Sequence, residues 1–168
     1  MKRNFIIALV GLIILILQQT VIMNISLFGI KIDLLLIFIV SISMFIDKTD
    51  IIFTVLPIGI VKDAFFPYVF GLNTLILVLV SLIVCMIEKK IYKDTIIIPM
   101  IFTFFATLIK LAITLLFLLP TGILGTNYNY IGKTVVFETL FNSALAVIVY
   151  NYVKRMMNSE TLKREWKF

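Results

Sequence analysis

Long apolar stretches fill most of the chain, and short polar segments separate them. The first stretch, residues 5–23, is long enough to cross the hydrocarbon layer of a bilayer, about 30 Å thick, as a helix. The same pattern predicts further helical spans over residues 33–46, 51–66, 72–87, 96–119 and 134–153. The sequence therefore predicts an all-α integral membrane protein, a six-helix bundle in a single transmembrane domain over residues 1–168, with a basic cytoplasmic tail at 154–168.

The second and third spans, 33–46 and 51–66, are unusually short. At 1.5 Å per residue, helices of 14 and 16 residues cover only about 21–24 Å. Pro57 and Gly59 interrupt the third span, so we expect its helix to be broken there. The pair either crosses the membrane fully or forms a tilted or re-entrant hairpin, and both arrangements leave the two chain ends on the same side.

The composition excludes several kinds of chemistry. Hydrophobic residues make up 62% of the chain and charged residues only 14%, which is typical of a membrane protein. The chain contains no histidine, and Cys85 is its single cysteine. A cysteine–histidine nucleophile, a zinc site of the usual nitrogen and sulfur type, and a disulfide are therefore excluded within one chain. We expect no cofactor, no bound metal and no catalytic residue.

The basic residues predict the orientation of the chain in the membrane. Of the 15 lysines and arginines, 11 lie at the N-terminus, in the second and fourth connections or at the C-terminus: Lys2, Arg3, Lys48, Lys89, Lys90, Lys93, Lys154, Arg155, Lys163, Arg164 and Lys167. Because cytoplasmic loops are enriched in Lys and Arg, we expect both termini in the cytoplasm. The net charge of +6 flanks apolar spans, which favours contact with anionic lipids over nucleic acid. The tail either lies on the membrane as a short helix anchored by Trp166 and Phe168, or is a solvated stub.

A few polar residues interrupt the apolar spans. Lys110 lies in the middle of the fifth span, and Glu138 and Asn142 lie one turn apart in the sixth. An ionisable group in hydrocarbon normally faces the bundle interior and finds a partner. We therefore expect Lys110 to pair with Glu138 or Asn142, because the short connection 120–133 makes the two helices neighbours.

Most of these charges are predicted to lie in the outer half of the membrane. Counting the rise per residue places Asp33, Lys62, Asp63 and Glu138 there. An outward-facing cluster argues against a proton wire, which needs carboxylates at several depths. The cluster either fixes helix register as a buried ion pair or forms a pocket for a ligand or partner. Asp33 lies at the start of a predicted helix, where the positive end of the helix dipole favours an acidic side chain. This position alone is sufficient to explain an acid there.

Three short elements carry a family resemblance. Asp33-Leu34-Leu35 opens the second span, Gly59 and Asp63 form a Gly-x-x-x-Asp element in the third, and Gly71-Leu72-Asn73 begins the fourth. Their order and spacing resemble the MreD family of rod shape-determining proteins. The chain length, the number of spans and the mid-span Asn142 agree with this family. Two departures are Ile32, where the family usually has proline, and Pro57, where it usually has a small residue.

The resemblance implies a non-enzymatic inner-membrane component of the bacterial elongation machinery, with a bundle similar to the S components of energy-coupling-factor vitamin transporters. Such a protein associates with the single-span protein MreC and, through it, with the MreB filament, RodA and a penicillin-binding transpeptidase; a homodimer is left open. The candidate partner-facing or pocket-facing residues are Asp33, Gly59, Asp63, Gly71, Asn73, Lys110, Glu138 and Asn142.

Two alternatives belong to other classes of protein. The first is a vitamin-binding S component, whose first helix usually carries Ala-x-x-x-Ala; here Leu12 follows Ala8 instead. The second is an intramembrane aspartyl enzyme built on Asp33 and Asp63. Neither a Gly-x-Gly-Asp motif nor a lipid-transferase signature surrounds these two residues, which disfavours an enzyme.

Overall fold

The computed structural model describes residues 2–20, 32–65, 69–88, 97–121 and 128–159. Six helices lie in these ranges, and the prediction of an all-α protein is confirmed. Their bounds are Lys2–Thr20 (α1), Leu34–Ser43 (α2), Lys48–Phe65 (α3), Leu72–Glu88 (α4), Ile97–Leu118 (α5) and Tyr128–Met157 (α6). The first four residues of the predicted tail therefore continue α6, whereas Trp166 and Phe168 lie outside the described residues.

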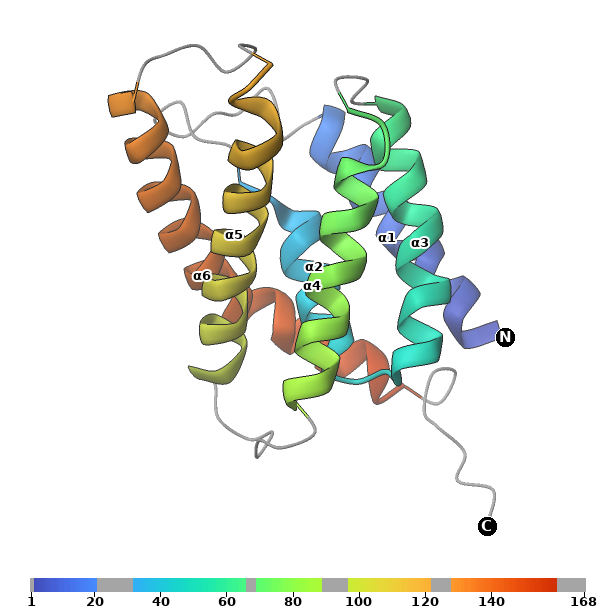
Figure 1. Ribbon diagram of the computed structural model, residues 1–168. Coiled ribbons are helices and arrows are strands. Elements are labelled where there is room, and N and C mark those ends of the chain that lie inside the picture. The colour runs from blue at the N-terminus through green and yellow to red at the C-terminus, as the bar shows by residue number, and fades with distance from the viewer. Residues whose placement is uncertain (1, 21–31, 66–68, 89–96, 122–127, 160–168) are drawn as a thin grey trace.

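The helices form two groups with α2 between them (Figure 1). One group contains α1, α3 and α4, in which α3 packs extensively against α4 and also against α1. The other group is the pair α5 and α6. The start of α1 and the C-terminal end of α6 lie toward the same end of the bundle, where α2 ends and α3 begins (Figure 1).

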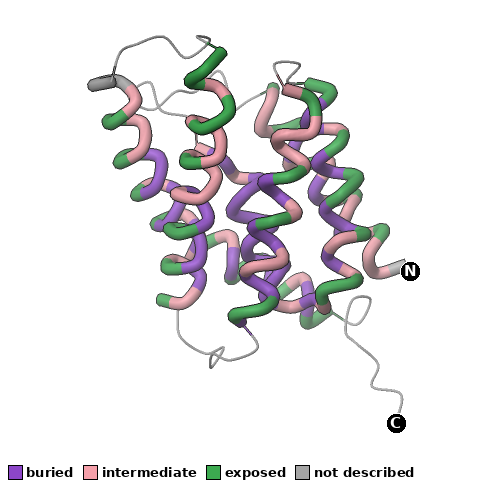
Figure 2. The backbone as a smooth tube through the Cα atoms, viewed as in Figure 1, coloured by how far each residue is buried: buried purple, intermediate pink, exposed green. Residues whose placement is uncertain are grey.

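Helix α2 is the centre of the core. It contacts α1, α4, α5 and α6, and every residue from Leu35 to Ser43 is buried (Figure 2). A helix surrounded by protein is expected to be apolar on all sides, and eight of the ten residues of this one are apolar. Its two serines donate to main-chain carbonyls one turn back, Ser41 to Ile37 and Ser43 to Ile39, so their hydroxyls are satisfied locally. At 10 residues, α2 is only about 15 Å long and begins in the interior of the bundle.

The predicted break in the third span is wrong, because α3 continues through Pro57 and Gly59. A proline within a helix removes one hydrogen-bond donor, and membrane helices tolerate this where neighbouring helices support them. Gly59 is required by the close approach of α4: a β-carbon there would lie 2.7 Å from the Cα of Thr74. The small residue therefore lets the two helices pack backbone to backbone.

Within the described residues, three helices are long and apolar enough to cross a membrane: α1 over Arg3–Thr20, α5 over Ile97–Leu118 and α6 over Ile131–Met157. Helices α2 and α4 are apolar but shorter. The outer surface carries large exposed apolar side chains such as Phe5, Phe53 and Leu116. This surface suits contact with lipid and identifies the chain as a membrane protein.

Candidate functional site

Asp33 precedes α2 at the predicted start of a helix, and its side chain caps that helix and has several further polar partners. Its Oδ1 accepts hydrogen bonds from the main-chain N–H of Leu36 (3.1 Å) and from the Gln18 side-chain amide on α1 (3.2 Å). Its Oδ2 lies 2.7 Å from the Nζ of Lys110 on α5 and 3.3 Å from the Nζ of Lys62 on α3. One buried carboxylate therefore connects α1, α2, α3 and α5.

Helix α6 joins this site through two side chains. Glu138 accepts from the Nζ of Lys110 at 2.6 Å, so the predicted pairing of Lys110 with Glu138 is confirmed. Asn142 does not take part in that pairing. Its Oδ1 accepts from the main-chain N–H of Asp33 at 3.1 Å, and its Nδ2 donates to the hydroxyl of Thr107 at 3.3 Å. Asn142 therefore connects α6 to α2 and α5.

These side chains form one cluster in which opposite charges alternate. The interior polar cluster consists of Gln18, Asp33, Lys62, Thr107, Lys110, Glu138 and Asn142. Its four charged members follow the order Lys62, Asp33, Lys110, Glu138, and their net charge is zero. Of these four charged residues, only Lys110 is appreciably exposed, with 20% of its side chain accessible. Because the remaining charges are buried, loss of one partner leaves an uncompensated charge, which typically costs about 3–5 kcal/mol.

Asp63 lies outside this cluster, although it follows Lys62 directly in the sequence. Its carboxylate accepts hydrogen bonds at the start of α4 from the main-chain N–H groups of Asn73 (2.9 Å) and Thr74 (3.0 Å). It also accepts from the Asn73 side-chain amide (3.0 Å) and the Thr74 hydroxyl (2.5 Å). A carboxylate at a helix N-terminus satisfies N–H groups that have no partner within the helix and interacts favourably with the helix dipole.

The remaining candidates, Gly59, Gly71 and Asn73, lie around this cap. Gly71 has a φ of +93°, a backbone conformation that glycine adopts readily, and α4 begins at the next residue. Gly59 lies against Thr74. We call Gly59, Asp63, Gly71, Asn73 and Thr74 the α3–α4 junction. The eight predicted residues therefore divide between two separate places, the interior polar cluster and the α3–α4 junction.

Gln18 was not among the site residues predicted from the sequence. Besides donating to Asp33, it accepts a hydrogen bond from the main-chain N–H of Leu35 at 2.8 Å, so it supports the first turn of α2. The available signal was the polar run Gln18-Gln19-Thr20 near the end of the apolar first span. Lys62 was expected in the outer half but was not counted among the candidates.

The site is suited to holding helices together. Asp33 is occupied by donors from three other helices, and Lys110 stands between the two carboxylates Asp33 and Glu138. A carboxylate so occupied has little capacity left to activate water or to take up a proton. Among the described residues, no group of three or more His, Cys, Asp or Glu side chains is placed to hold a metal ion.

Fold and site together define an α-helical membrane protein whose polar interior is used for helix–helix contacts. A family model described as "rod shape-determining protein MreD" matches residues 1–158, and the chain belongs to the MreD family. No curated protein and no solved structure matches the chain significantly. Membership in this family gives the protein a role in rod shape determination. The family consists of shape-determination components and is not known as a family of enzymes. It is associated with the MreB/MreC shape complex.

Proposed function

We propose that this protein is a non-enzymatic, multi-pass component of the cytoplasmic membrane in the bacterial elongation complex. It binds an MreC-like single-span protein and thereby couples the MreB cytoskeleton to peptidoglycan synthesis by RodA and a penicillin-binding transpeptidase. The observation that carries this proposal is the family match over residues 1–158, nearly the whole chain.

The polar contacts support a scaffold. The ionisable side chains of the interior polar cluster are paired with one another, as Lys110 is with Asp33 and Glu138. Such pairing favours a fixed arrangement of the helices. The alternative, a vitamin-binding S component, needs polar groups that orient the vitamin in a pocket. The groove between α4 and α5 is lined by apolar side chains and offers none.

The orientation proposed for the chain has both termini in the cytoplasm. The distribution of lysine and arginine supports it, and so does the position of the start of α1 and the end of α6 at the same end of the bundle (Figure 1). The basic tail would then face the anionic lipids of the inner leaflet.

The α3–α4 junction is the proposed contact surface for the MreC-like partner. Phe70 beside it is 70% exposed, and the space around the Cα of Gly71 is open, with no atom within 4 Å of a β-carbon built there. An exposed aromatic ring next to an open glycine is a surface on which another protein can pack without disturbing the buried Asp63 cap.

Deletion of the gene in its host tests the proposal. Cells should become round, and the wild-type protein expressed from a plasmid should restore rods and retain the MreC-like protein during purification. Phe70→Ala should accumulate normally while retaining less of that partner, with the exposed Phe53→Ala on the same helix group as the control. Normal rods combined with a vitamin requirement would contradict the proposal and favour the S component.

A further inference from the structure

The outer face of α3 carries an exposed proline in the interior of the helix. Pro57 lies well inside Lys48–Phe65 and is exposed, as are Phe53, Leu56 and Ile60. These four residues recur at helical spacing, so they lie on one side of α3. We call them the α3 stripe. Its Phe53 is 76% exposed.

Pro57 leaves one main-chain carbonyl without its helical donor. In an α-helix the carbonyl of each residue accepts from the N–H four residues later, and proline has no N–H. The Phe53 carbonyl oxygen therefore lacks its usual hydrogen bond, and it lies on the outer face because both Phe53 and Pro57 are exposed. The hydroxyl of the next residue, Thr54, does not replace the donor, because it donates to the carbonyl of Asp50 at 2.8 Å.

The depth of Pro57 in the membrane follows from the contact of α3 with α1. Gly11 lies near the middle of the candidate span Arg3–Thr20, and a β-carbon added to it would meet the side chain of Ile58. Ile58 follows Pro57 directly, so the Phe53 carbonyl lies near the middle of the hydrocarbon layer. Water is excluded at this depth, and an unpaired backbone polar group is strongly destabilising there.

The missing donor must come from a molecule that covers the α3 stripe. Lipid chains have no donor, and a symmetric dimer would place the same face of a second copy opposite the stripe. Among the described residues of α1 and α3, the exposed side chains level with Pro57 are apolar, such as Leu9, Ile13 and Ile60. The occupant that supplies a donor is a membrane-spanning helix of another protein with a hydroxyl or amide side chain near its middle, since such side chains form hydrogen bonds across helices.

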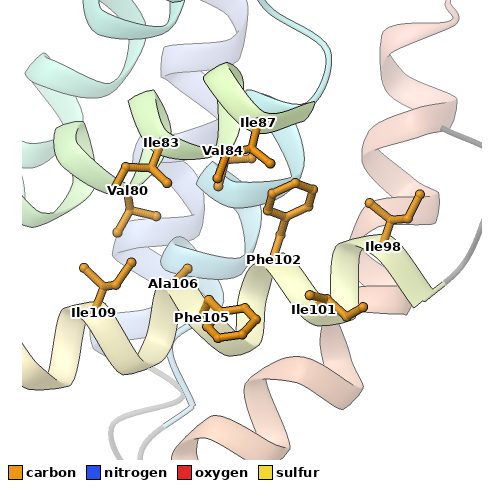
Figure 3. A pocket seen from close by; sticks show the side chains of 10 residues that line it. All are labelled: Val80, Ile83, Val84, Ile87, Ile98, Ile101, Phe102, Phe105, Ala106 and Ile109. Atoms are coloured by element: carbon orange, nitrogen blue, oxygen red, sulfur yellow. The ribbon is translucent and has the colours of Figure 1, made fainter. Parts of the chain in front are cut away.

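The apolar groove between α4 and α5 provides a contrast (Figure 3). Its lining side chains, such as Val84 and Phe102, are aliphatic or phenylalanine. No proline lies in α4, and Pro99 lies in the first turn of α5, where an N–H has no helical partner in any case. Neither helix therefore frees a carbonyl beside the groove through a proline, and lipid chains suffice to cover that surface.

We propose that the α3 stripe binds a membrane-spanning helix of another protein, whose Ser, Thr, Asn or Gln side chain donates a hydrogen bond to the Phe53 carbonyl. The hydrogen bond selects the helix and sets its depth, and the apolar side chains of the stripe pack against it. The stripe lies on a different face of α3 from Gly59 and Asp63, which meet α4. The contact therefore goes beyond the one proposed for the MreC-like protein at the α3–α4 junction.

Competition between two model peptides tests this selection. Each peptide has a span of about 20 leucines flanked by lysines, and one of the two carries Asn in place of the central leucine. The purified full-length protein is incubated in mild detergent with an equimolar mixture of the two peptides, which carry different mass labels. Native mass spectrometry then measures which peptide is retained. The wild type should retain the Asn peptide about threefold more than the leucine peptide, the factor expected of one hydrogen bond between membrane helices.

Two proline substitutions form a matched pair. Pro57→Ala supplies the missing N–H within α3 and keeps a good helix former there, so the preference should fall to about one. Pro99→Ala makes the same change in the first turn of α5, where it supplies no missing helical bond, and should keep the preference. Leu56→Ala alters the stripe but leaves the carbonyl unpaired, so it should keep the preference as well.

Three results would overturn the proposal. Equal retention of the two peptides by the wild type would show that the carbonyl selects no donor. An undiminished preference in Pro57→Ala, or its loss in Pro99→Ala, would place the selecting group elsewhere. A wild-type dimer that Pro57→Ala dissociates would assign the stripe to a second copy of this chain.

Discussion

The α3–α4 junction and the interior polar cluster both use buried carboxylates, but they are built differently. At the junction, Asp63 accepts from uncharged donors only 10 and 11 residues away. In the cluster, Asp33 meets cations from distant helices, Lys62 and Lys110. The first contact closes one helical hairpin, whereas the second fixes α2 against helices of both groups. Loss of the cluster should therefore disturb the whole bundle, and loss of the junction should disturb one hairpin.

The largest effect is expected at Asp33. Asp33→Ala removes the partner of Lys62, one of the two partners of Lys110 and the cap of α2, so we expect a loss of about 3–5 kcal/mol and little accumulated protein. Asp33→Asn keeps a capping side chain and isolates the loss of charge. Thermal unfolding in detergent micelles measures the difference; equal stability of Asp33→Asn and the wild type would show that the charge is unnecessary.

Glu138 should show a compensated loss. Glu138→Ala leaves the cluster with a net positive charge, and we expect a loss of about 3 kcal/mol. Adding Lys110→Met restores neutrality, because Asp33 still pairs with Lys62. The double variant should therefore be more stable than Glu138→Ala alone. If the losses of Glu138→Ala and Lys110→Met, measured singly by thermal unfolding, add up to the loss of the double variant, Lys110 and Glu138 do not interact.

Asp63 should have a smaller and separate effect. Asp63→Ala leaves the N-terminus of α4 without its cap and should cost about 2 kcal/mol. Since the junction shares no hydrogen bond with the cluster, this loss should add to that of Glu138→Ala within about 0.5 kcal/mol. A strong coupling between the two substitutions would show that the two regions form one network.

Gly59 tests the close approach of α3 and α4. A β-carbon at this position meets the backbone of Thr74, so Gly59→Ala should destabilise the protein by about 1–3 kcal/mol. Gly132→Ala in α6 is the matched control, because nothing lies within 4 Å of its added carbon. That substitution should be neutral or should stabilise by about 0.5–1 kcal/mol through helix propensity. Equal melting temperatures for the two variants would contradict the close packing.

The sequence was most informative about the helices themselves and about the depth of polar residues along them. The helices follow from the apolar stretches, and the Lys110–Glu138 pair followed from depth along two neighbouring helices. The sequence placed Asp33 at the start of a helix but did not predict its contacts with Lys62 and Lys110, because these depend on how separate helices pack. The continuity of α3 through Pro57 depends in the same way on its neighbours.

We propose that the interior polar cluster acts by holding the helices together and not by binding a ligand. The most direct test is the shape of cells that carry Lys110→Met with Glu138→Ala as their only copy of the protein. If the cluster needs only a net charge of zero to hold the helices together, this double variant should accumulate near the wild-type level and restore rods. Glu138→Ala alone should leave cells round and containing little of the protein. Round cells that contain normal amounts of the double variant would contradict the account and assign these charges to a ligand or a partner.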